Sequence, residues 1–323
     1  MGYKIFNIFI AAASAAVLFA GCAGKKTSAP QSRPFPLVQV PGVVAAEQDA
    51  AMEYAAEHYW DAFISSKGEY VCDSTLVHGV KKADVEEAFA NWLGLLSNLD
   101  ISRAKKDVSM LYSKADACES ADTASNVFET MTGLVEKYLY DPNSPLRNED
   151  LYGVYAQKLS LCERLEQLER EKYAREAALC SLNGIGTPVA DFEFSDKRGV
   201  TRRLYDIRAD YTLLFFSNPG CKACKEIIET LTDALAVSGL ISTGKLAVVN
   251  VYIDEDLSAW YEYMPIYPED WYNGFDPNGV IRADTLYNVR AIPSLYLLDK
   301  DKIVLAKDAP QENVFAFLER LGN

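Results

Sequence analysis

The chain has 323 residues, of which 49% are apolar and 24% are charged, and its formal net charge at pH 7 is −14. This length fits two ordinary domains, and this composition excludes wholesale disorder. So acidic a chain argues against nucleic acid as a partner and against a basic lipid-binding face. The simplest role of the charge is to keep the protein in solution.

Residues 1–21 are predicted to be a targeting segment, because Lys4 precedes an apolar run that ends in small residues. The sequence LFAGC at residues 18–22 resembles the lipobox of bacterial lipoproteins, with Phe19 where Leu is usual. This resemblance implies that a signal peptide, residues 1–21, is removed and that Cys22 is lipidated as the mature N-terminus. A retained transmembrane anchor is the alternative. Either one places the body of the protein outside the cytoplasm.

Residues 23–44 are rich in Ser, Pro, Gly, Ala and Lys, so they are predicted to form a flexible tether. Residues 45–182 are predicted to form an all-α domain, because apolar residues recur at helical spacing and no strand pattern stands out. The expected helices span residues 45–64, 83–98, 103–117, 122–139 and 148–181. DPNSP at residues 141–145 ends one helix, and Asn148 is expected to cap the next.

The helical domain shows no catalytic pattern. His58 and His78 are the only histidines of the chain, and Asp61 lies one helical turn beyond His58. So few ligands do not make a metal site, and packing or surface roles are the simpler interpretation. We expect neither a metal nor a cofactor.

The chain has a second group of cysteines besides the targeting cysteine and the pair discussed below. Cys72, Cys118, Cys162 and Cys180 allow three pairings, and an oxidising compartment permits disulfides. If residues 148–181 form one helix, Cys162 and Cys180 are about 27 Å apart and do not bridge. A break in that helix reopens the pairing. Buried free thiols are the alternative.

Residues 184–323 are predicted to form an α/β domain, because strand and helix signals alternate after the break at residues 183–188. The expected strands span residues 190–194, 200–204, 211–217, 245–253, 291–298 and 303–305. One expected helix runs from Cys221 to about Val237, and another covers residues 313–321. The inward-facing side chains expected in the first helix are those of Ile227, Ile228, Leu231 and Leu235.

Tyr211–Glu226, YTLLFFSNPGCKACKE, predicts a buried strand, a turn, and a helix that opens on two cysteines. Unpaired N–H groups and the helix dipole favour a thiolate at this position. Cys221 is the predicted nucleophile and Cys224 the buried resolving thiol, while Lys222 and Lys225 add positive charge. A zinc half-site would need a second ligand pair, which the sequence lacks, and a permanently closed structural disulfide is the other alternative.

Ile292-Pro293 opens a predicted strand downstream of the cysteines. The simplest interpretation is that a proline is tolerated at a strand start or edge. After a strand–Cys-x-x-C–helix unit it also suggests a cis-proline loop that faces the cysteines. There the backbone of Ile292 would pair with an extended segment of substrate.

Residues 184–323 resemble the thioredoxin superfamily. PGCKAC at residues 219–224 and VRAIPSL at residues 289–295 carry this resemblance. The branch it resembles most comprises the membrane-tethered thiol-disulfide oxidoreductases of extracytoplasmic cysteine reduction and cytochrome maturation. GTPVADF at residues 186–192 resembles the entry segment of that branch and of peroxiredoxins. EKYLYDPNSPLRNEDLY at residues 136–152 resembles an uncharacterised helical domain found before such modules in lipoproteins of gut-dwelling Gram-negative bacteria.

The chain departs from the family pattern around the cysteines. Gly220 replaces the usual aromatic residue, Phe215 stands where thioredoxin has a buried aspartate, and Ile227 stands where cytochrome-maturation relatives often have glutamate. Glu226 and Asp254 are the candidate proton carriers, and neither is assigned.

The resemblance implies a lipid-anchored, extracytoplasmic thiol-disulfide oxidoreductase that reduces protein disulfides. Its expected partners are protein thiols and disulfides and an upstream redox protein, on the periplasm-facing membrane of a Gram-negative bacterium. A peroxide reductase is an alternative, although residues 218–224 lack the Pro-x-x-x-Thr-x-x-Cys pattern. A non-enzymatic partner-binding lipoprotein is another. The absence of histidine between the cysteines leans towards a reductant, and the direction of electron flow stays open.

Overall fold

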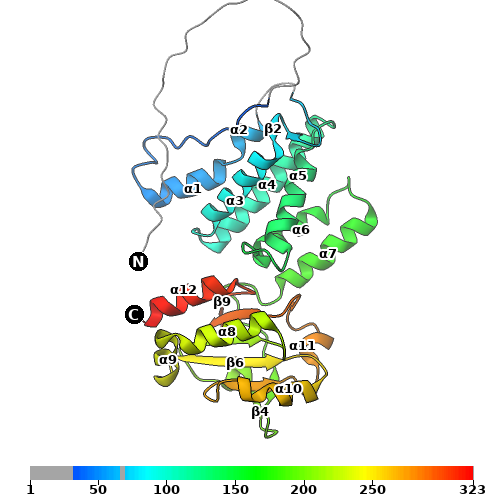
Figure 1. The fold of residues 1–323 in the computed structure, drawn as a ribbon. Coiled ribbons are helices and arrows are strands. Elements are labelled where there is room, and N and C mark those ends of the chain that lie inside the picture. The colour runs from blue at the N-terminus through cyan, green and yellow to red at the C-terminus, as the bar shows by residue number, and fades with distance from the viewer. Residues whose placement is uncertain (1–31, 66–69, 323) are drawn as a thin grey trace, which may run out of the picture. The chain divides into compact units, whose positions relative to one another are not determined.

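The structure is a computed structural model that describes residues 32–65 and 70–322. The predicted signal peptide, Cys22 and the first part of the tether lie outside the described residues. Within the described ranges, no helix is long and apolar enough to cross a membrane. The predicted succession of a helical domain and an α/β domain is confirmed (Figure 1).

Residues 32–44, the end of the predicted tether, are attached to the helical domain. The Arg33 guanidinium donates hydrogen bonds to the carbonyl oxygens of His78 and Phe63, at 2.9 and 3.1 Å. The Phe35 ring stacks on the Phe63 ring, with a centroid separation of 5.3 Å. Arg33 and Phe35 therefore pack against the helical domain through hydrogen bonds from a charged group and aromatic contacts.

The helical domain is built around a core of large aromatic side chains. Trp60 and Trp92 are buried and meet edge to face, with centroids 5.9 Å apart. Trp92 Nε1 donates to the Ala56 carbonyl oxygen at 3.0 Å, which satisfies its one polar atom. A short hairpin, β1 (Leu76–Val77) and β2 (Val80–Lys81), was not predicted. The helices are α1 (Gln48–His58), α2 (Asp61–Ile64), α3 (Lys82–Leu96), α4 (Ile101–Ala121), α5 (Val127–Val135) with the π-helical η1 (Glu136–Tyr140), α6 (Glu149–Leu159) and α7 (Gln167–Ser181).

The predicted helix at residues 148–181 is wrong in its length, because it is divided into α6 and α7. Asn148 caps α6 as expected, since its Oδ1 accepts a hydrogen bond from the Leu151 N–H at 3.1 Å. A capping box of Glu166 and Glu169 starts α7. The residues around this second cap have good helix propensity. The break between α6 and α7 was therefore not visible in the sequence.

The C-terminal domain is built on a mixed sheet that has seven strands among the described residues, in the order β4-β3-β7-β6-β5-β8-β9. β5 is parallel to β6 and β6 to β7, and the other neighbours are antiparallel. Only β7 was not predicted. The strands are β3 (Glu193–Ser195), β4 (Thr201–Arg203), β5 (Tyr211–Phe216), β6 (Leu246–Tyr252), β7 (Tyr272–Phe275), β8 (Ser294–Asp299) and β9 (Val304–Ala306).

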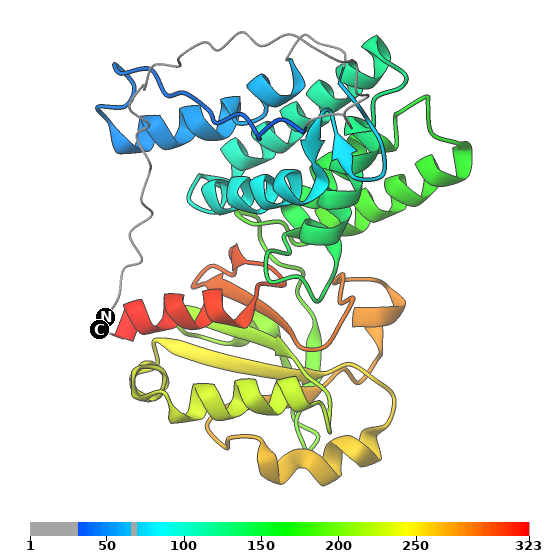
Figure 2. The same ribbon diagram turned by 45° about the horizontal axis from the view of Figure 1, so that its top comes forward.

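Figure 2 shows helices of this domain beside the sheet, and apolar side chains cover both faces of the sheet. On one face, α8 (Lys222–Asp233), α9 (Leu235–Ser242) and α12 (Gln311–Gly322) pack against β5 and β8. On the other face, loop residues such as Phe192 and Tyr287 pack against alternate side chains of the same strands. The connection from β6 to β8 carries α10 (Leu257–Tyr263), η3 (Met264–Ile266), β7 and α11 (Val280–Ala283), and η2 (Leu204–Asp206) precedes β5. Burial on both faces explains the continuous apolar run of β5.

The predicted helix from Cys221 to Val237 is interrupted. Ala234 has extended backbone angles and separates α8 from α9. The interruption breaks the helical register, so Leu235, predicted to face inward, is 88% exposed. Ile227, Ile228 and Leu231, which precede the break, are buried as predicted.

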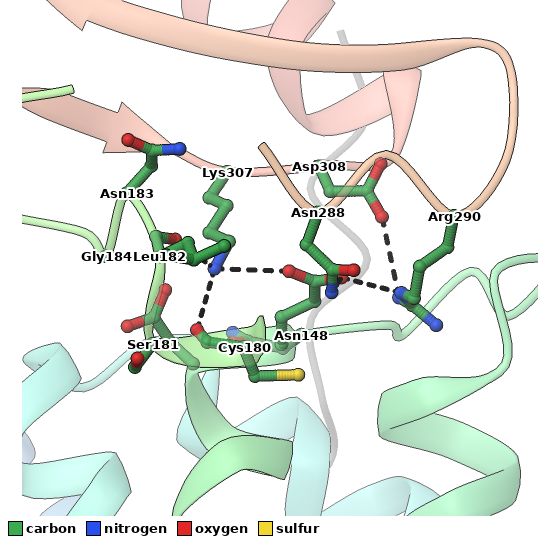
Figure 3. Close-up of polar contacts among 12 residues, drawn as sticks. Asn148, Cys180, Ser181, Leu182, Asn183, Gly184, Asn288, Arg290, Lys307 and Asp308 are labelled. Carbon is green, nitrogen blue, oxygen red and sulfur yellow. Dashed lines mark hydrogen bonds and ion pairs between the residues drawn. The ribbon is translucent and has the colours of Figure 1, made fainter. Parts of the chain in front are cut away.

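The two domains meet at a buried cluster of charged groups around Glu149, the first residue of α6 (Figure 3). One oxygen of Glu149 accepts hydrogen bonds from Asn288 Nδ2 at 2.8 Å and Arg290 Nε at 2.6 Å. Its other oxygen lies 3.1 Å from Lys307 Nζ, which also donates to two carbonyl oxygens at the end of α7, at 2.7 and 2.6 Å. Because buried charges require partners, this cluster fixes how the helical domain contacts the C-terminal domain.

We expect Glu149→Gln to lower the free energy of unfolding by about 3 kcal/mol, because it leaves Arg290 and Lys307 buried beside a neutral amide. Urea denaturation followed by circular dichroism measures the change. Glu229→Gln is the matched control: its carboxylate pairs with Lys225 at 3.6 Å on the surface of α8, and we expect a change below about 1 kcal/mol. Equal effects of the two substitutions would contradict the assigned role of Glu149.

Candidate active site

The two cysteines predicted to react lie where β5 passes into α8. Cys221 is the N-cap of α8, and its Sγ accepts a hydrogen bond from the Cys224 N–H at 3.1 Å. A disulfide joins the two residues, whose Cα atoms are 5.2 Å apart. Cys221 is half-buried, whereas Cys224 is 1% exposed among apolar side chains. A reduced Cys221 at this position would have its thiolate stabilised by the helix N-terminus.

The antiparallel pairing of β5 and β8 explains why the cysteines and Pro293 are close. Phe216, at the end of β5, is paired with Ser294, at the start of β8. The segments that extend these strands, one leading to Cys221 and the other containing Pro293, therefore lie at the same edge of the sheet. The Ile292–Pro293 peptide bond is cis.

A groove of about 340 Å³ runs beside this pair of segments. Ala223 and Ile227 line it from α8, and Ile292 and Pro293 line it from the loop before β8. Ile292 and Cys221 also pack against the same apolar core. The structure thus brings together the four predicted site residues of this domain, which are Cys221, Cys224, Ile292 and Pro293. Cys224 and Pro293 are 69 residues apart in sequence.

Gly220 precedes the first cysteine with φ at +73°, in the left-handed region. A Cβ at this position would meet no atom within 4 Å, so space does not exclude a side chain. The backbone conformation disfavours a side chain, because non-glycine residues cost roughly 1–2 kcal/mol there. The turn therefore explains the departure from the aromatic residue of the family pattern.

The lysines beside the cysteines are neutralised in part by their neighbours. Lys222 Nζ lies 3.5 Å from Glu226, and Lys225 Nζ lies 3.6 Å from Glu229, each one helical turn further along α8. These pairs are exposed, so they are weak and screened by salt. The helix N-terminus, rather than the lysines, is the main source of positive potential at Cys221.

The two candidate proton carriers are engaged elsewhere. Glu226 is exposed and pairs with Lys222. Asp254 lies 2.6 Å from Arg282 and accepts a hydrogen bond from Asn218. Phe215, at the position where thioredoxin has an aspartate, is fully buried in the apolar core. No carboxylate is therefore assigned to proton transfer.

A buried polar chain, missed in the sequence, connects the strands at the cysteine edge of the sheet. Ser217 Oγ donates to Asn250 Oδ1 at 2.5 Å, and Asn250 Nδ2 donates to Asn273 Oδ1 at 3.0 Å. Asn273 Nδ2 in turn donates to the Pro268 carbonyl oxygen at 2.7 Å. The sequence did carry a signal for this hydrogen-bonded chain: Ser217 directly follows the apolar strand β5, and Asn250 lies inside the apolar strand β6. These side-chain hydrogen bonds connect β5, β6 and β7 near the start of α8.

The histidine positions have structural partners. His58 Nδ1 lies 2.7 Å from Oδ2 of Asp61. The other carboxylate oxygen of Asp61 pairs with Lys114. His78 has φ at +50°, and its ring lies 4.5 Å from the Tyr70 ring. Within residues 32–65 and 70–322, no group of three or more His, Cys, Asp or Glu side chains is placed to hold a metal ion.

The four remaining cysteines carry free thiols. The break between α6 and α7 would have permitted a bridge between Cys162 and Cys180, yet both are buried and unpaired. Burial, together with the negative charge of Glu149, raises the pKa of the Cys180 thiol to about 12. Burial also raises the pKa of Cys118, where the hydrogen bond with Ser125 opposes the effect.

Comparison with known proteins gives two family matches. A model described as a domain of unknown function, DUF5106, matches residues 20–183, and a model described as thioredoxin-like matches residues 209–304. No curated protein matches at a significant level.

Several solved structures are similar to the chain. A thioredoxin-like protein from Bacteroides caccae is 33% identical with a TM-score of 0.74, over 88% of this chain and 98% of that one. The C-terminal domain of an uncharacterized protein from Bacteroides fragilis is 43% identical with a TM-score of 0.41, over 42% of this chain and 97% of that one. The thioredoxin domain of a thiol-disulfide oxidoreductase from Bacteroides vulgatus is 19% identical with a TM-score of 0.38, over 43% of this chain and 99% of that one.

We expect Cys180 to resist alkylation in the folded, reduced protein at pH 8, since a pKa of about 12 leaves about one thiol in ten thousand ionised. Peptide mass spectrometry after iodoacetamide treatment measures this, and Cys221 in the same sample is the reactive reference. In denaturant Cys180 should react fully. Labelling of Cys180 at the rate of Cys221 in the native protein would contradict the burial of this thiol.

Proposed function

Because the chain belongs to the thioredoxin-like proteins, with a DUF5106 domain ahead of the thioredoxin-like one, we propose that it is a thiol-disulfide oxidoreductase that reduces protein disulfides. The observation that carries this proposal is the arrangement of the cysteines. Half-buried Cys221 is the N-cap of α8, and a disulfide joins it to buried Cys224 beside a cis-proline loop. One sulfur is open to a substrate and the other is positioned to resolve.

The reduced pair acts in two exchange steps. The Cys221 thiolate attacks one sulfur of the substrate disulfide, the substrate S–S bond breaks, and the other substrate sulfur leaves as a thiolate. The Cys224 thiolate then attacks Cys221 Sγ, which forms the Cys221–Cys224 disulfide and releases the second substrate thiolate. Two electrons pass to the substrate, and the two thiol protons of the pair balance the released thiolates. An upstream dithiol protein of the same chemistry restores the reduced pair.

The loop before β8 binds the substrate backbone in this proposal. Ile292 and Pro293 line the groove beside α8, and the Ile292 backbone pairs with an extended segment next to the substrate disulfide. Such pairing depends little on side chains, so it suits an enzyme that acts on more than one protein.

We further propose that the protein acts outside the cytoplasm, on the periplasm-facing membrane of a Gram-negative bacterium, attached through lipidated Cys22. The lipobox-like sequence at residues 18–22 supports this location. An oxidising compartment is also where protein disulfides that need reduction or rearrangement occur.

Replacement of the nucleophile tests the activity. We expect Cys221→Ser to slow insulin reduction by more than about 100-fold, because a serine hydroxyl does not supply the thiolate. The assay follows turbidity of the reduced insulin chains with dithiothreitol as reductant. Cys72→Ser, at a half-exposed cysteine of the helical domain, is the matched control and should retain full activity. Activity that survives Cys221→Ser would overturn the redox assignment.

Replacement of Cys22 tests the location. We expect the full chain to appear in the membrane fraction of a Gram-negative host and to incorporate labelled palmitate, and Cys22→Ala to lose the label. The retained transmembrane anchor predicts a different result, membrane association without label in both forms. That outcome would refute lipidation.

A further inference from the structure

The groove beside the cysteines has walls from both domains. Ile227 and Pro293 line it from the thioredoxin-like domain. Pro142, Asn143 and Arg147 line it from the segment between η1 and α6 of the helical domain, and Pro145 of that segment lines it as well; we call residues 142–147 the wall loop.

Arg290 attaches the thioredoxin-like domain to both ends of the wall loop. Its Nη1 donates to the carbonyl oxygen of Tyr140, before the loop, and the guanidinium lies 4.3 Å from the centre of the Tyr140 ring. Its Nε donates to Glu149, after the loop, at 2.6 Å. Arg290 itself is three residues before Pro293. One guanidinium, largely but not fully buried, therefore holds the wall loop and the cis-proline loop together.

A second connection runs through Asp308. Arg147 Nε lies 3.5 Å from Asp308 Oδ2, and Arg147 Nη2 donates a hydrogen bond to the Ala309 carbonyl oxygen at 3.2 Å. The other oxygen of Asp308 accepts a hydrogen bond from Ser294 Oγ at 2.7 Å. Ser294 directly follows Pro293, so the last residue of the wall loop, Arg147, is connected through Asp308 to the residue after the cis bond.

The wall loop is also braced internally. The Asn143 N–H donates to Asp141 Oδ1 at 2.8 Å, and Ser144 Oγ donates to the Tyr138 carbonyl oxygen at 2.6 Å. Two prolines restrict its backbone further. The side chains of Asn143 and Pro145 nevertheless remain exposed. The loop is therefore a fixed surface that presents exposed side chains to the groove.

The opposite wall offers a free backbone. Among the described residues, nothing accepts a hydrogen bond from the Ile292 N–H or donates one to its carbonyl oxygen. An extended chain is the occupant that supplies both partners at once. A small disulfide needs neither the backbone nor the wall loop to reach the half-buried sulfur of Cys221.

We infer that the helical domain is part of the substrate site: its wall loop forms one side of a groove that receives the extended polypeptide segment next to a substrate disulfide. This inference rests on the proposed reductase activity. It makes Asn143 and Pro145 contact residues for polypeptide substrates, and Arg290, Arg147 and Glu149 positioning residues that act through the two loops.

Asn143→Trp tests the inference by filling the groove from its helical-domain side. The pre-reduced full chain reacts with two oxidants, insulin and the small reagent dithiobis(2-nitrobenzoate), and the rate constant is measured for each. We expect the insulin rate to fall by about tenfold and the small-reagent rate to stay within about twofold, because only the polypeptide must enter the groove.

The chain offers a matched control in a second Asp-Pro-Asn turn. Asn278 is exposed, and its N–H donates to Asp276 Oδ1 at 3.2 Å, as that of Asn143 does to Asp141. Asn278 does not line the groove, so Asn278→Trp should leave both rates unchanged. If Asn143→Trp fails to fold by circular dichroism, Pro145→Trp provides the same test.

The outcomes separate the inference from the proposed function. An unchanged insulin rate in Asn143→Trp, or an equal loss towards both reagents, would overturn the role of the wall loop while the reductase activity stands. A wild-type protein that reacts with the small reagent and does not reduce insulin would overturn the proposed function and the inference together. A selective loss towards insulin supports both.

Discussion

The contact between the Glu149 carboxylate and two cations of the thioredoxin-like domain determines how the rest of the molecule is arranged. Glu149 stands at the N-terminus of α6, where the helix dipole favours an anion, and Lys307 contacts the carbonyl end of α7, where it favours a cation. Each charge of the cluster therefore lies at the helix end of opposite sign, which stabilises it. Burial of such groups costs desolvation, so their main effect is to select one arrangement of the two domains rather than to add stability.

The reactive end of the thioredoxin-like domain follows from strand pairing. β5 lies between parallel β6 and antiparallel β8, so the segment after β5 and the segment before β8 share one edge of the sheet. The first carries a thiol at a helix N-terminus, and the second carries a cis-proline with free backbone groups before it. The Glu149 cluster contacts the second segment through Arg290. Domain arrangement and site geometry thus depend on the same side chains.

The sequence predicted the features that depend on neighbours along the chain. Local signals predicted the strand, turn and helix around Cys221 and the cap at Asn148. The spacing of apolar residues likewise predicted the helices of the first domain. Several other features depend on residues far apart in sequence. In the sequence, nothing distinguishes Glu149 and Arg290 from surface residues, because their contact forms only in the folded protein. β7 was not predicted because Asn273 and Gly274 interrupt its apolar pattern, and these two residues are explained only by the buried polar chain and by the close contact with β3.

The conformation of Gly220 has a consequence for how this protein can change over evolutionary time. A mutation to an aromatic residue, which would give Cys221 the hydrophobic neighbour common in the wider family, must first overcome an unfavourable backbone angle. No such barrier applies to Asn143 and Pro145, whose side chains are exposed. In the proposed reductase, the range of polypeptide substrates would therefore change more easily through the wall loop than through the cysteine turn. The helical domain would then diversify the substrates of the proposed reductase while the cysteine pair stays the same.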